Sequence, residues 1–334
     1  MSDPQPTLPG GADVEDADLA VLGEGVCETC ATVVDADELL CGTCGARLPA
    51  ALDATQPPPP ALRCGPCGAS TVTWGADGQC GYCGSADVTM TGGPIAAAPT
   101  GLIPFSVVEG EARVLLASWV GFPHLKPAAL SRPGAAGSLR RVFIPHWLFT
   151  SDVHTCWTAD TDEVPDGRRG QWAPVFGETS STVTGLLIAA SGVLPQRHSD
   201  KLGHYDLRAL APCDWSLPAG APAEAPAVAR RTARAVARSR LIAREHARCA
   251  ALLAPRRLRH LRVNPLLENM KSTLVLLPAW VLTYRHRGRV RRFVLNGQSG
   301  GVRGTAPLCP LRIGAAVAVM TAVMVVFWFL LSRS

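Results

Sequence analysis

Charged side chains are scarce in this sequence, since Asp, Glu, Lys and Arg make up 18% of its 334 residues. Lysine is scarcer still, with three of the 32 basic residues, whereas Gly (32) and Pro (28) are frequent. So few charges and so many turn formers exclude a helical bundle with long exposed helices. The 47% of hydrophobic residues excludes wholesale disorder, and the length suits about two domains of roughly 150 residues each.

Basic residues are absent from the N-terminal part. Residues 1–46 carry ten acidic side chains and no Lys or Arg. We therefore expect no secretory signal peptide, which would begin with a basic region followed by a short apolar stretch. Residues 1–22 are expected to form a disordered acidic tail.

One long apolar run extends from Ile313 to Leu331. At about 1.5 Å per residue, this run covers roughly the 30 Å hydrocarbon core of a bilayer. A buried core helix would show a polar face, whereas this run is apolar all round. We therefore expect one transmembrane helix at 311–332 and a tail-anchored protein in the cytoplasmic membrane. The arginines that precede it, by the positive-inside rule, predict a cytoplasmic N-terminal region: Arg291, Arg292, Arg303 and Arg312.

Eight of the twelve cysteines form four Cys-x2-Cys pairs. Ten residues separate the first two pairs and twelve separate the last two. This spacing is typical of two zinc ribbons, each with a four-cysteine site on two tight turns, or knuckles. Gly follows the second Cys of three knuckles, where a positive φ is needed, and Ala31 takes that place in the remaining one. The expected ligands are Cys27, Cys30, Cys41, Cys44, Cys64, Cys67, Cys80 and Cys83.

Two other states of these cysteines compete with zinc. Disulfides are disfavoured in the cytoplasm because thiols there stay reduced. Iron in a rubredoxin-like site accepts the same four thiolates, so ligand chemistry alone leaves it open. We expect two structural Zn²⁺ ions, because four protein thiolates leave no open coordination position and modules this small need a metal to fold.

Composition shifts divide the chain into modules. The Pro57–Pro60 run predicts a short polyproline II spacer between the two ribbons. The expected order is zinc ribbon 1 at 23–50, a Pro-rich linker at 51–62, zinc ribbon 2 at 63–90, a linker at 91–100 and a cytoplasmic α+β domain with a mainly antiparallel sheet at 101–305.

Strand and helix signals fill the α+β domain. The expected strands are 141–150, 181–188, 273–284 and 290–295, a turn is expected at Asn296-Gly297 before 301–303, and the expected helices are 109–121 and 225–253. Two strands share the pattern apolar-Pro-x-Trp-apolar-apolar-Thr, at 144–150 and 277–283. Both are expected to enter related sheets with a buried indole, through duplication or chance.

Several of these segments carry a family resemblance. They are ribbon 2 running into Ile103-Pro104-Phe105, then Leu125-Lys126-Pro127, the Pro-x-Trp strand, 276–284 and 294–300. Together they resemble a bacterial family of membrane proteins with TFIIB-type zinc ribbons, often labelled primosomal protein N′ or helicase-like. The resemblance spans about residues 60–330.

The resemblance implies a non-enzymatic membrane adaptor. Some family members are encoded beside phage-shock-type and SPFH or virion-core-like proteins, which are the cytoplasmic partners it suggests. This chain departs from the family pattern at His146, at Gly301 and in the Ala/Pro-rich stretch 212–226, where a further strand is expected. These departures concern the partner surface more than the fold.

Motifs for catalysis are missing. A helicase needs a Gly-rich phosphate loop ending in Gly-Lys-Ser/Thr, and the one Lys followed by Ser or Thr, Lys271, lacks the glycines. His146, His154 and Cys156, or His198 and His204, have no recognised metal spacing. We therefore expect no enzyme, and isolated thiols at Cys156, Cys213 and Cys249; Cys309 is a candidate for palmitoylation.

The Arg-rich helix is compatible with three kinds of binding partner. Its arginines fall at mixed helical spacings and would attract nucleic acid, anionic lipid or an acidic protein, although a GC-rich genome also favours Arg over Lys. Base-stacking aromatics are absent from 230–253. A solvated helix that packs on the sheet through Val228, Val236, Leu241 and Leu252 is the structural alternative.

Overall fold

A computed structural model describes most of the chain. The described residues are 24–31, 33–35, 41, 44–48, 60–72, 78–94, 97–120, 139–162, 172–213, 221–253, 257–286, 289–304, 318, 320, 321, 324, 325 and 328. The chain divides into two compact units, residues 1–57 and residues 58–334. The expected tail at 1–22 and most of the expected linker at 51–62 lie outside the described residues.

The first unit is built on a short hairpin. Strand β1 (Glu24–Val26) pairs antiparallel with β2 (Val33–Asp35). Its small core contains two cysteines together with Val34 and Leu48. This small apolar core cannot stabilise a fold by itself. A metal ion bound by the cysteines is therefore the natural source of stability.

The second unit contains a seven-stranded sheet. Its order is β12-β11-β10-β6-β9, with β7 paired to β10 and β8 paired to β7. The β10–β6 pairing is parallel and the others are antiparallel, which confirms the expected α+β class with a mainly antiparallel sheet. The strands are β6 (Pro99–Leu102), β7 (Leu139–Thr161), β8 (Ala173–Ala189), β9 (Ala211–Pro212), β10 (Leu258–His286), β11 (Arg289–Asn296) and β12 (Val302–Gly304).

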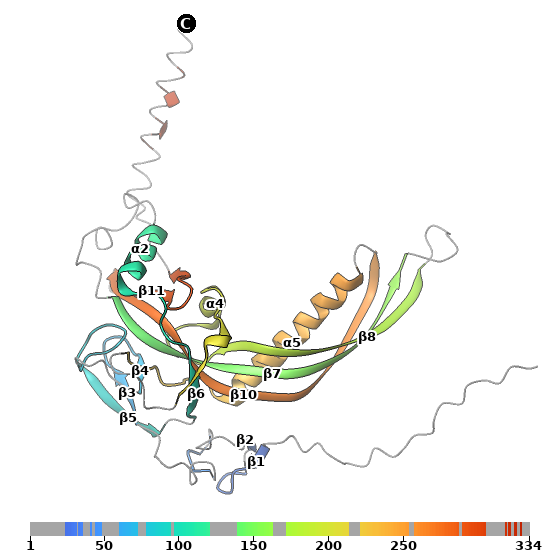
Figure 1. The fold of residues 1–334 in the computed structure, drawn as a ribbon, viewed down its shortest axis with the longest axis horizontal. Helices are drawn as coiled ribbons and strands as arrows, with labels where there is room; N and C mark the ends of the chain where they lie inside the picture. Colours follow the sequence, from blue (N-terminus) through green and yellow to red (C-terminus); the bar gives the residue numbers. More distant parts are fainter. Residues whose placement is uncertain are drawn as a thin grey trace, which may run out of the picture. The chain divides into compact units, whose positions relative to one another are not determined.

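Three of these strands are much longer than the sequence predicted. β7, β8 and β10 contain the expected strands but continue for a further stretch at one end, where they form a long curved ribbon (Figure 1). In this continuation exposed residues mostly alternate with half-buried or buried ones, and the apolar runs that mark a buried strand are missing. The two Pro-x-Trp segments are neighbours in the sheet, with Ile144 opposite Leu277. Trp147 and Trp280 are both buried, as expected.

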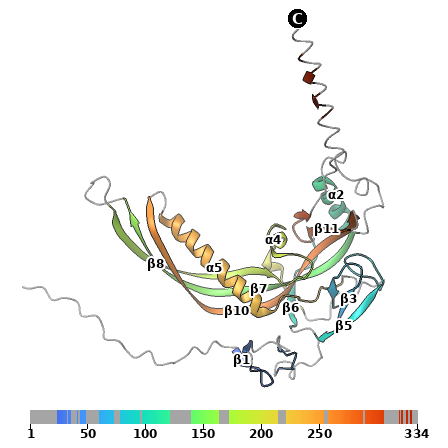
Figure 2. The same ribbon diagram turned by 180° about the vertical axis from the view of Figure 1, so that it is seen from behind.

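Two main helices accompany the sheet. Helix α2 (Glu109–Val120) contributes Ala112 and Leu116 to a core with β11 and β12, and α5 (Arg230–Leu253) follows the concave side of β7, β8 and β10 (Figure 1; Figure 2). The short helix α4 (Gln196–Ser199) and the 3₁₀ helix η2 (Leu207–Ala209) lie between β8 and β9 in the chain.

The face by which α5 packs differs from the expected one. Leu241 is buried and Val228 packs against the core as predicted, but Val236 and Leu252 are exposed. The buried residues recur mostly at every fourth position and include Ala233, Ala237 and Cys249. Small side chains let the helix lie close to the strands, which turns the larger Val and Leu outward.

The second ribbon is continuous with the α+β domain. It comprises β3 (Pro60–Cys64), β4 (Ser70–Thr71) and β5 (Val88–Pro94) in the order β4-β3-β5. The linker expected at 91–100 falls on the end of β5, on residues 95 and 96, which lie outside the described residues, and on the start of β6. β5 extends to Pro94 and β6 begins at Pro99, so the backbone at both ends of that stretch is held in strand pairing with β3 and β10.

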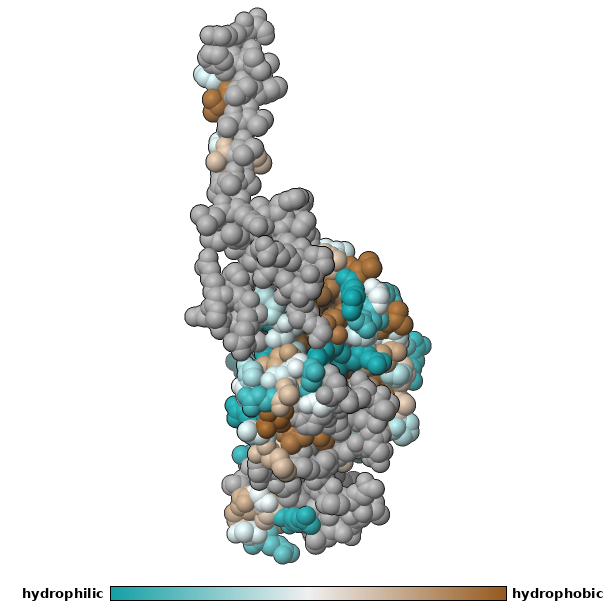
Figure 3. All heavy atoms as spheres, turned by 90° about the vertical axis from the view of Figure 1, so that its left-hand side faces the viewer, coloured by the Kyte–Doolittle hydropathy of each residue, from teal (hydrophilic) through white to brown (hydrophobic). Residues whose placement is uncertain are grey.

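Most of the expected transmembrane segment at 311–332 lies outside the described residues. Its six described residues are helical, and four of them, Met320, Met324, Val325 and Trp328, are at least 63% exposed. Figure 3 shows hydrophobic side chains on the surface of this segment. Within the described part of the chain, no helix is long and apolar enough to cross a membrane.

Candidate metal centres

The eight patterned cysteines gather into two groups of four, as their spacing predicts. The ligand atoms of Cys27, Cys30, Cys41 and Cys44 lie within 4.8 Å of one another, and so do those of Cys64, Cys67, Cys80 and Cys83. We name these groups site 1 and site 2. Among the described residues, no other group of three or more His, Cys, Asp or Glu side chains is drawn together in this way.

Each site is built from two equivalent turns. The residue after the second Cys donates its backbone N–H to the carbonyl of the first Cys at 2.8 Å, in all four knuckles. That residue has a positive φ, of 71–76° at Gly45, Gly68 and Gly84 and of 55° at Ala31. The predicted positive φ at these positions is therefore confirmed, and Ala31 adopts it despite its Cβ.

The sulfur positions fit a tetrahedral metal. Zn–S bonds of about 2.3 Å place two thiolates of a tetrahedron about 3.8 Å apart. The Sγ atoms of Cys27 and Cys44 are 3.6 Å apart, and those of Cys67 and Cys80 are 3.7 Å apart. A disulfide would need about 2.05 Å, and all eight cysteines are free. Four sulfurs around one point leave no position for a substrate, so such sites hold structure together.

Without a cation, the four thiols of site 2 do not ionise together. Burial raises the pKa of Cys64 to about 12. The hydrogen bond from the Cys80 thiol lowers the pKa of Cys67 to about 4, and the same bond raises the pKa of Cys80 far above its ordinary value. A divalent cation removes this conflict because it favours the thiolate at all four positions.

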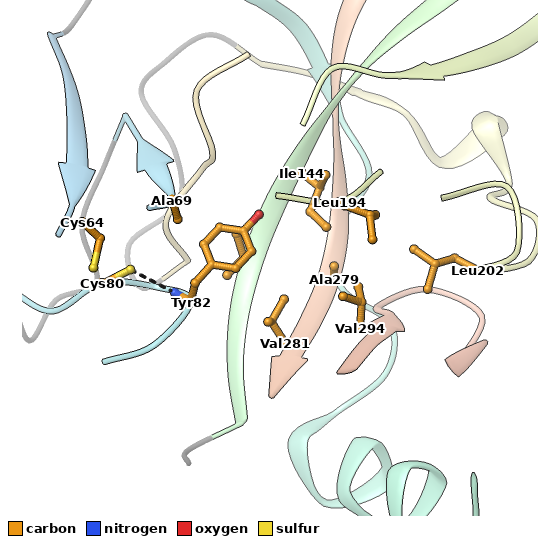
Figure 4. Close-up of a cluster of buried hydrophobic side chains, with 11 residues drawn as sticks. Cys64, Ala69, Cys80, Tyr82, Ile144, Leu194, Leu202, Ala279, Val281 and Val294 are labelled. Atoms are coloured by element: carbon orange, nitrogen blue, oxygen red, sulfur yellow. Dashed lines mark hydrogen bonds between the residues drawn. The ribbon is translucent and has the colours of Figure 1, made fainter. Parts of the chain in front are cut away.

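Site 2 is part of the core of the second unit. Cys64, Cys80 and Tyr82 share a buried cluster with Ile144 of β7 and Val281 of β10, and Figure 4 shows the Tyr82 ring extending from the ribbon toward the sheet. Ribbon 2 and the α+β domain therefore share one hydrophobic core.

Backbone carbonyls of both site 2 knuckles are held by the sheet. Thr283 of β10 donates its hydroxyl to the carbonyl of Tyr82 at 2.6 Å. Arg292 of β11 donates from Nη2 to the carbonyl of Cys67, also at 2.6 Å. Because Tyr82 lies between two ligands and Cys67 is one, these bonds fix the turns that present the sulfurs.

A buried carboxylate completes this contact. Glu224 is 1% exposed and accepts hydrogen bonds from the hydroxyls of Tyr82 (2.5 Å) and Ser191 (2.6 Å) and from the backbone N–H groups of Gly192 (2.8 Å) and Val193 (3.1 Å). Burial raises the pKa of Glu224 above its usual range, while these hydrogen bonds oppose that rise. The four donors supply the partners that a buried carboxylate requires.

Glu224 belongs to an extended segment, residues 221–226, which we call the strap. Phe143 of β7 donates its N–H to the carbonyl of Pro222 at 2.9 Å, and Val72 of ribbon 2 donates to the carbonyl of Ala223 at 2.8 Å. The strap therefore joins ribbon 2 to the sheet. Sequence reasoning missed both Tyr82 and Glu224, because no local pattern connects residues so far apart; the aromatic side chain inside a knuckle was the one available signal.

The histidines noted in the sequence do not converge on a site. His146 is 1% exposed, and its Nε2 lies 2.7 Å from the hydroxyl of Ser199. Burial lowers the pKa of His146 to about 4, so the ring is neutral at physiological pH. His154 is exposed, 3.3 Å from a carboxylate oxygen of Glu268. Of the other cysteines, Cys156 is exposed and Cys249 buried, while Cys309 lies outside the described residues.

The arginines of α5 divide into two groups. Some make internal contacts: Arg230 lies over the ring of Trp147, Arg234 donates to the carbonyl of Met270, and Arg240 forms a two-pronged ion pair with Asp200. Others point to solvent, namely Arg231, Arg238 and Arg244. The helix has one acidic residue, Glu245, which is buried. The exposed side of α5 therefore carries positive charge.

Comparisons with known proteins give one weak similarity. No family model matches the chain, and no solved structure matches it. The chain is 22% identical over 226 residues to uncharacterized protein YdjG of Bacillus subtilis strain 168. The match covers 65% of this chain and 66% of YdjG, just under two thirds of that relative's length. A stretch of this size cannot lie within residues 1–57 and must include part of the second unit.

Proposed function

We propose that the chain is a non-enzymatic, tail-anchored adaptor that recruits cytoplasmic proteins to the membrane. The observation that carries this proposal is the pair of closed four-sulfur sites, one of which is built into the core of the α+β domain. Closed sites rigidify a small module without offering a reactive position, which suits a recognition surface.

Zinc is the metal we assign to both sites. The sulfur separations match a tetrahedral ion with bonds of about 2.3 Å, and zinc brings no redox chemistry that a structural role would have to suppress. Iron fits the same ligands, and metal analysis separates the two ions.

Membrane attachment rests on the C-terminal apolar run. An apolar segment of nineteen residues matches the bilayer core in length, and its described residues are helical with exposed apolar side chains. Basic residues before the run favour an N-terminal region in the cytoplasm. The family resemblance adds SPFH or virion-core-like and phage-shock-type proteins as the partners to examine first.

A recovery experiment tests the adaptor. The full chain is isolated from membranes in mild detergent, with and without nuclease, and bound proteins are identified. We expect one or a few proteins whose recovery survives nuclease and is lost in a chain that lacks residues 311–334. A Cys27→Ser/Cys30→Ser chain reports whether ribbon 1 makes the contact. Absence of any specific protein from the wild-type sample would contradict the adaptor.

The exposed arginines of α5 favour a second candidate, a membrane-tethered nucleic-acid-binding protein without helicase activity that is associated with replication. Phosphates would contact Arg231, Arg238 and Arg244, while the bases would find no aromatic partner on the helix. Micromolar binding of DNA or RNA at about 150 mM salt, with a steep salt dependence and no recoverable protein partner, would favour this candidate.

A further inference from the structure

The far part of the sheet is a three-stranded arm with two edges. We define the arm as residues 150–161 of β7, 173–184 of β8 and 258–271 of β10. β7 lies in the middle, so β8 forms one edge and β10 the other. Within the described residues, no other strand pairs with the outer side of β8 or of β10 in this region.

The β10 edge carries the features that prevent strand pairing. Its register against β7 shifts twice, and His260 and Asn269 adopt positive φ values of 55° and 49° at these irregularities. Pro265 lies between them, and Arg259 and Arg262 add charge. Bulges, proline and basic side chains are the means by which natural edge strands avoid pairing with other chains.

The β8 edge has none of these features between Val175 and Thr184. The segment contains no Pro, Lys or Arg, and its register against β7 is unbroken from Thr184 to Ala173. Six of its ten residues are Thr, Val or Phe, which favour strands. Phe176 is 83% exposed, the largest exposure among the exposed large hydrophobic side chains of the described residues. An unprotected edge with an exposed aromatic ring is suited to pairing with another strand.

We propose that this edge pairs, antiparallel, with the same edge of a second copy of the chain. A two-fold axis through Ser180 places Phe176 opposite Thr184 and Glu178 opposite Thr182. Aromatic and β-branched residues form favourable cross-strand pairs, and the two Glu178 carboxylates lie about 13 Å apart along the strands. The strand is therefore complementary to itself, which a two-fold contact requires.

The pairing joins two arms into one six-stranded sheet and gives each dimer two copies of ribbon 1. The paired segment contains no residue of site 1, site 2 or α5, so the proposal holds for the adaptor and for the nucleic-acid-binding protein alike.

The molecular mass of the full chain in detergent, measured by light scattering over a range of concentrations, tests the proposal. We expect a protein mass of two chains, each of 35.2 kDa. Ser180→Lys places two like charges on the two-fold axis and is expected to weaken the dimer at least tenfold. Ser180→Ala removes the hydrogen bond between Ser180 and His154 without adding charge and is expected to leave the dimer intact. Asn264→Lys, an exposed position on the β10 edge, is a second control.

A photo-crosslinking amino acid in place of Phe176 tests the register. Isotopically light and heavy copies are mixed, and crosslinks between them are expected to join position 176 to the region of Thr184. A monomer at all concentrations would overturn the proposal, and so would a dimer that resists Ser180→Lys or crosslinks that join other segments. Unchanged zinc content and near-ultraviolet circular dichroism confirm that the variants are folded.

Discussion

The hydroxyl of Tyr82, in a knuckle of site 2, donates a 2.5 Å hydrogen bond to Glu224, which lies 142 residues further along the chain. Both side chains are buried. This bond links a metal-binding turn to the strap and, through the strap, to β7. Site 2 is therefore built into the packing of the second unit, whereas site 1 belongs to the first unit, residues 1–57.

Removal of the Tyr82 hydroxyl tests this link. Tyr82→Phe keeps the ring in the core but leaves Glu224 with one donor fewer, at an expected cost of about 2 kcal/mol in the free energy of unfolding. Urea titration followed by tryptophan fluorescence measures the cost. Tyr205→Phe is the matched control, because the Tyr205 hydroxyl donates a longer bond, of 3.3 Å, to the carbonyl of Pro278. Equal costs in the two variants would contradict the link.

The two metal sites should respond differently to loss of a ligand. Cys80→Ser is expected to halve the zinc content and to loosen β7 and β10, because Cys80 belongs to the core that joins ribbon 2 to the sheet. Cys27→Ser is expected to halve the zinc content and leave the second unit unchanged. Hydrogen exchange of the β7 and β10 amides distinguishes them. Protection that survives Cys80→Ser would show that site 2 does not support the sheet.

The buried His146 side chain is expected to lower the free energy of unfolding in acid. Its pKa is lowered from 6.5 to about 4 by burial, so the folded state resists a proton that the unfolded state accepts. The stabilising contribution is fully present above pH 6.5 and is lost as the pH falls toward 4, by about 3 kcal/mol. Unfolding free energies across this range should fall more steeply for the wild type than for His146→Gln. Acid release of zinc affects both proteins, so the difference between them isolates His146, and parallel curves would contradict this account.

Deletion of residues 311–334 is expected to move the chain into the soluble fraction, because this segment is the strong anchor that the sequence predicts. Flotation with vesicles measures attachment. A truncated chain that still floats with the vesicles at high salt would show that the anchor lies in another segment. Binding that disappears as salt is raised would instead indicate electrostatic contact by the exposed arginines of α5.

The sequence predicted the metal ligands and the main sheet elements for physical reasons. Paired cysteines at fixed separation have few other uses, and the glycine after the second Cys marks the positive φ of a knuckle. The strands around Trp147 and Trp280 are apolar because both of their faces are covered. These features are local, so a single sequence suffices to find them.

The remaining features depend on contacts between distant residues. The arm was not predicted because its strands alternate exposed with more buried residues and lack the apolar runs of the strands around Trp147 and Trp280. The strap lies in an Ala/Pro-rich stretch that resembles a loop, and its role depends on Tyr82 at the far side of the unit. Ribbon 2 was expected to be a separate module. The residues that hold it against the sheet, Thr283 and Arg292, belong to no sequence motif, so the contact could not be predicted.

Metal analysis combined with X-ray absorption tests the central claim most directly. We predict two zinc ions per purified chain, each surrounded by four sulfurs at about 2.3 Å. Fewer than about 1.5 zinc ions per chain, substantial iron, or nitrogen and oxygen in the coordination sphere would contradict the two closed zinc sites on which the adaptor rests.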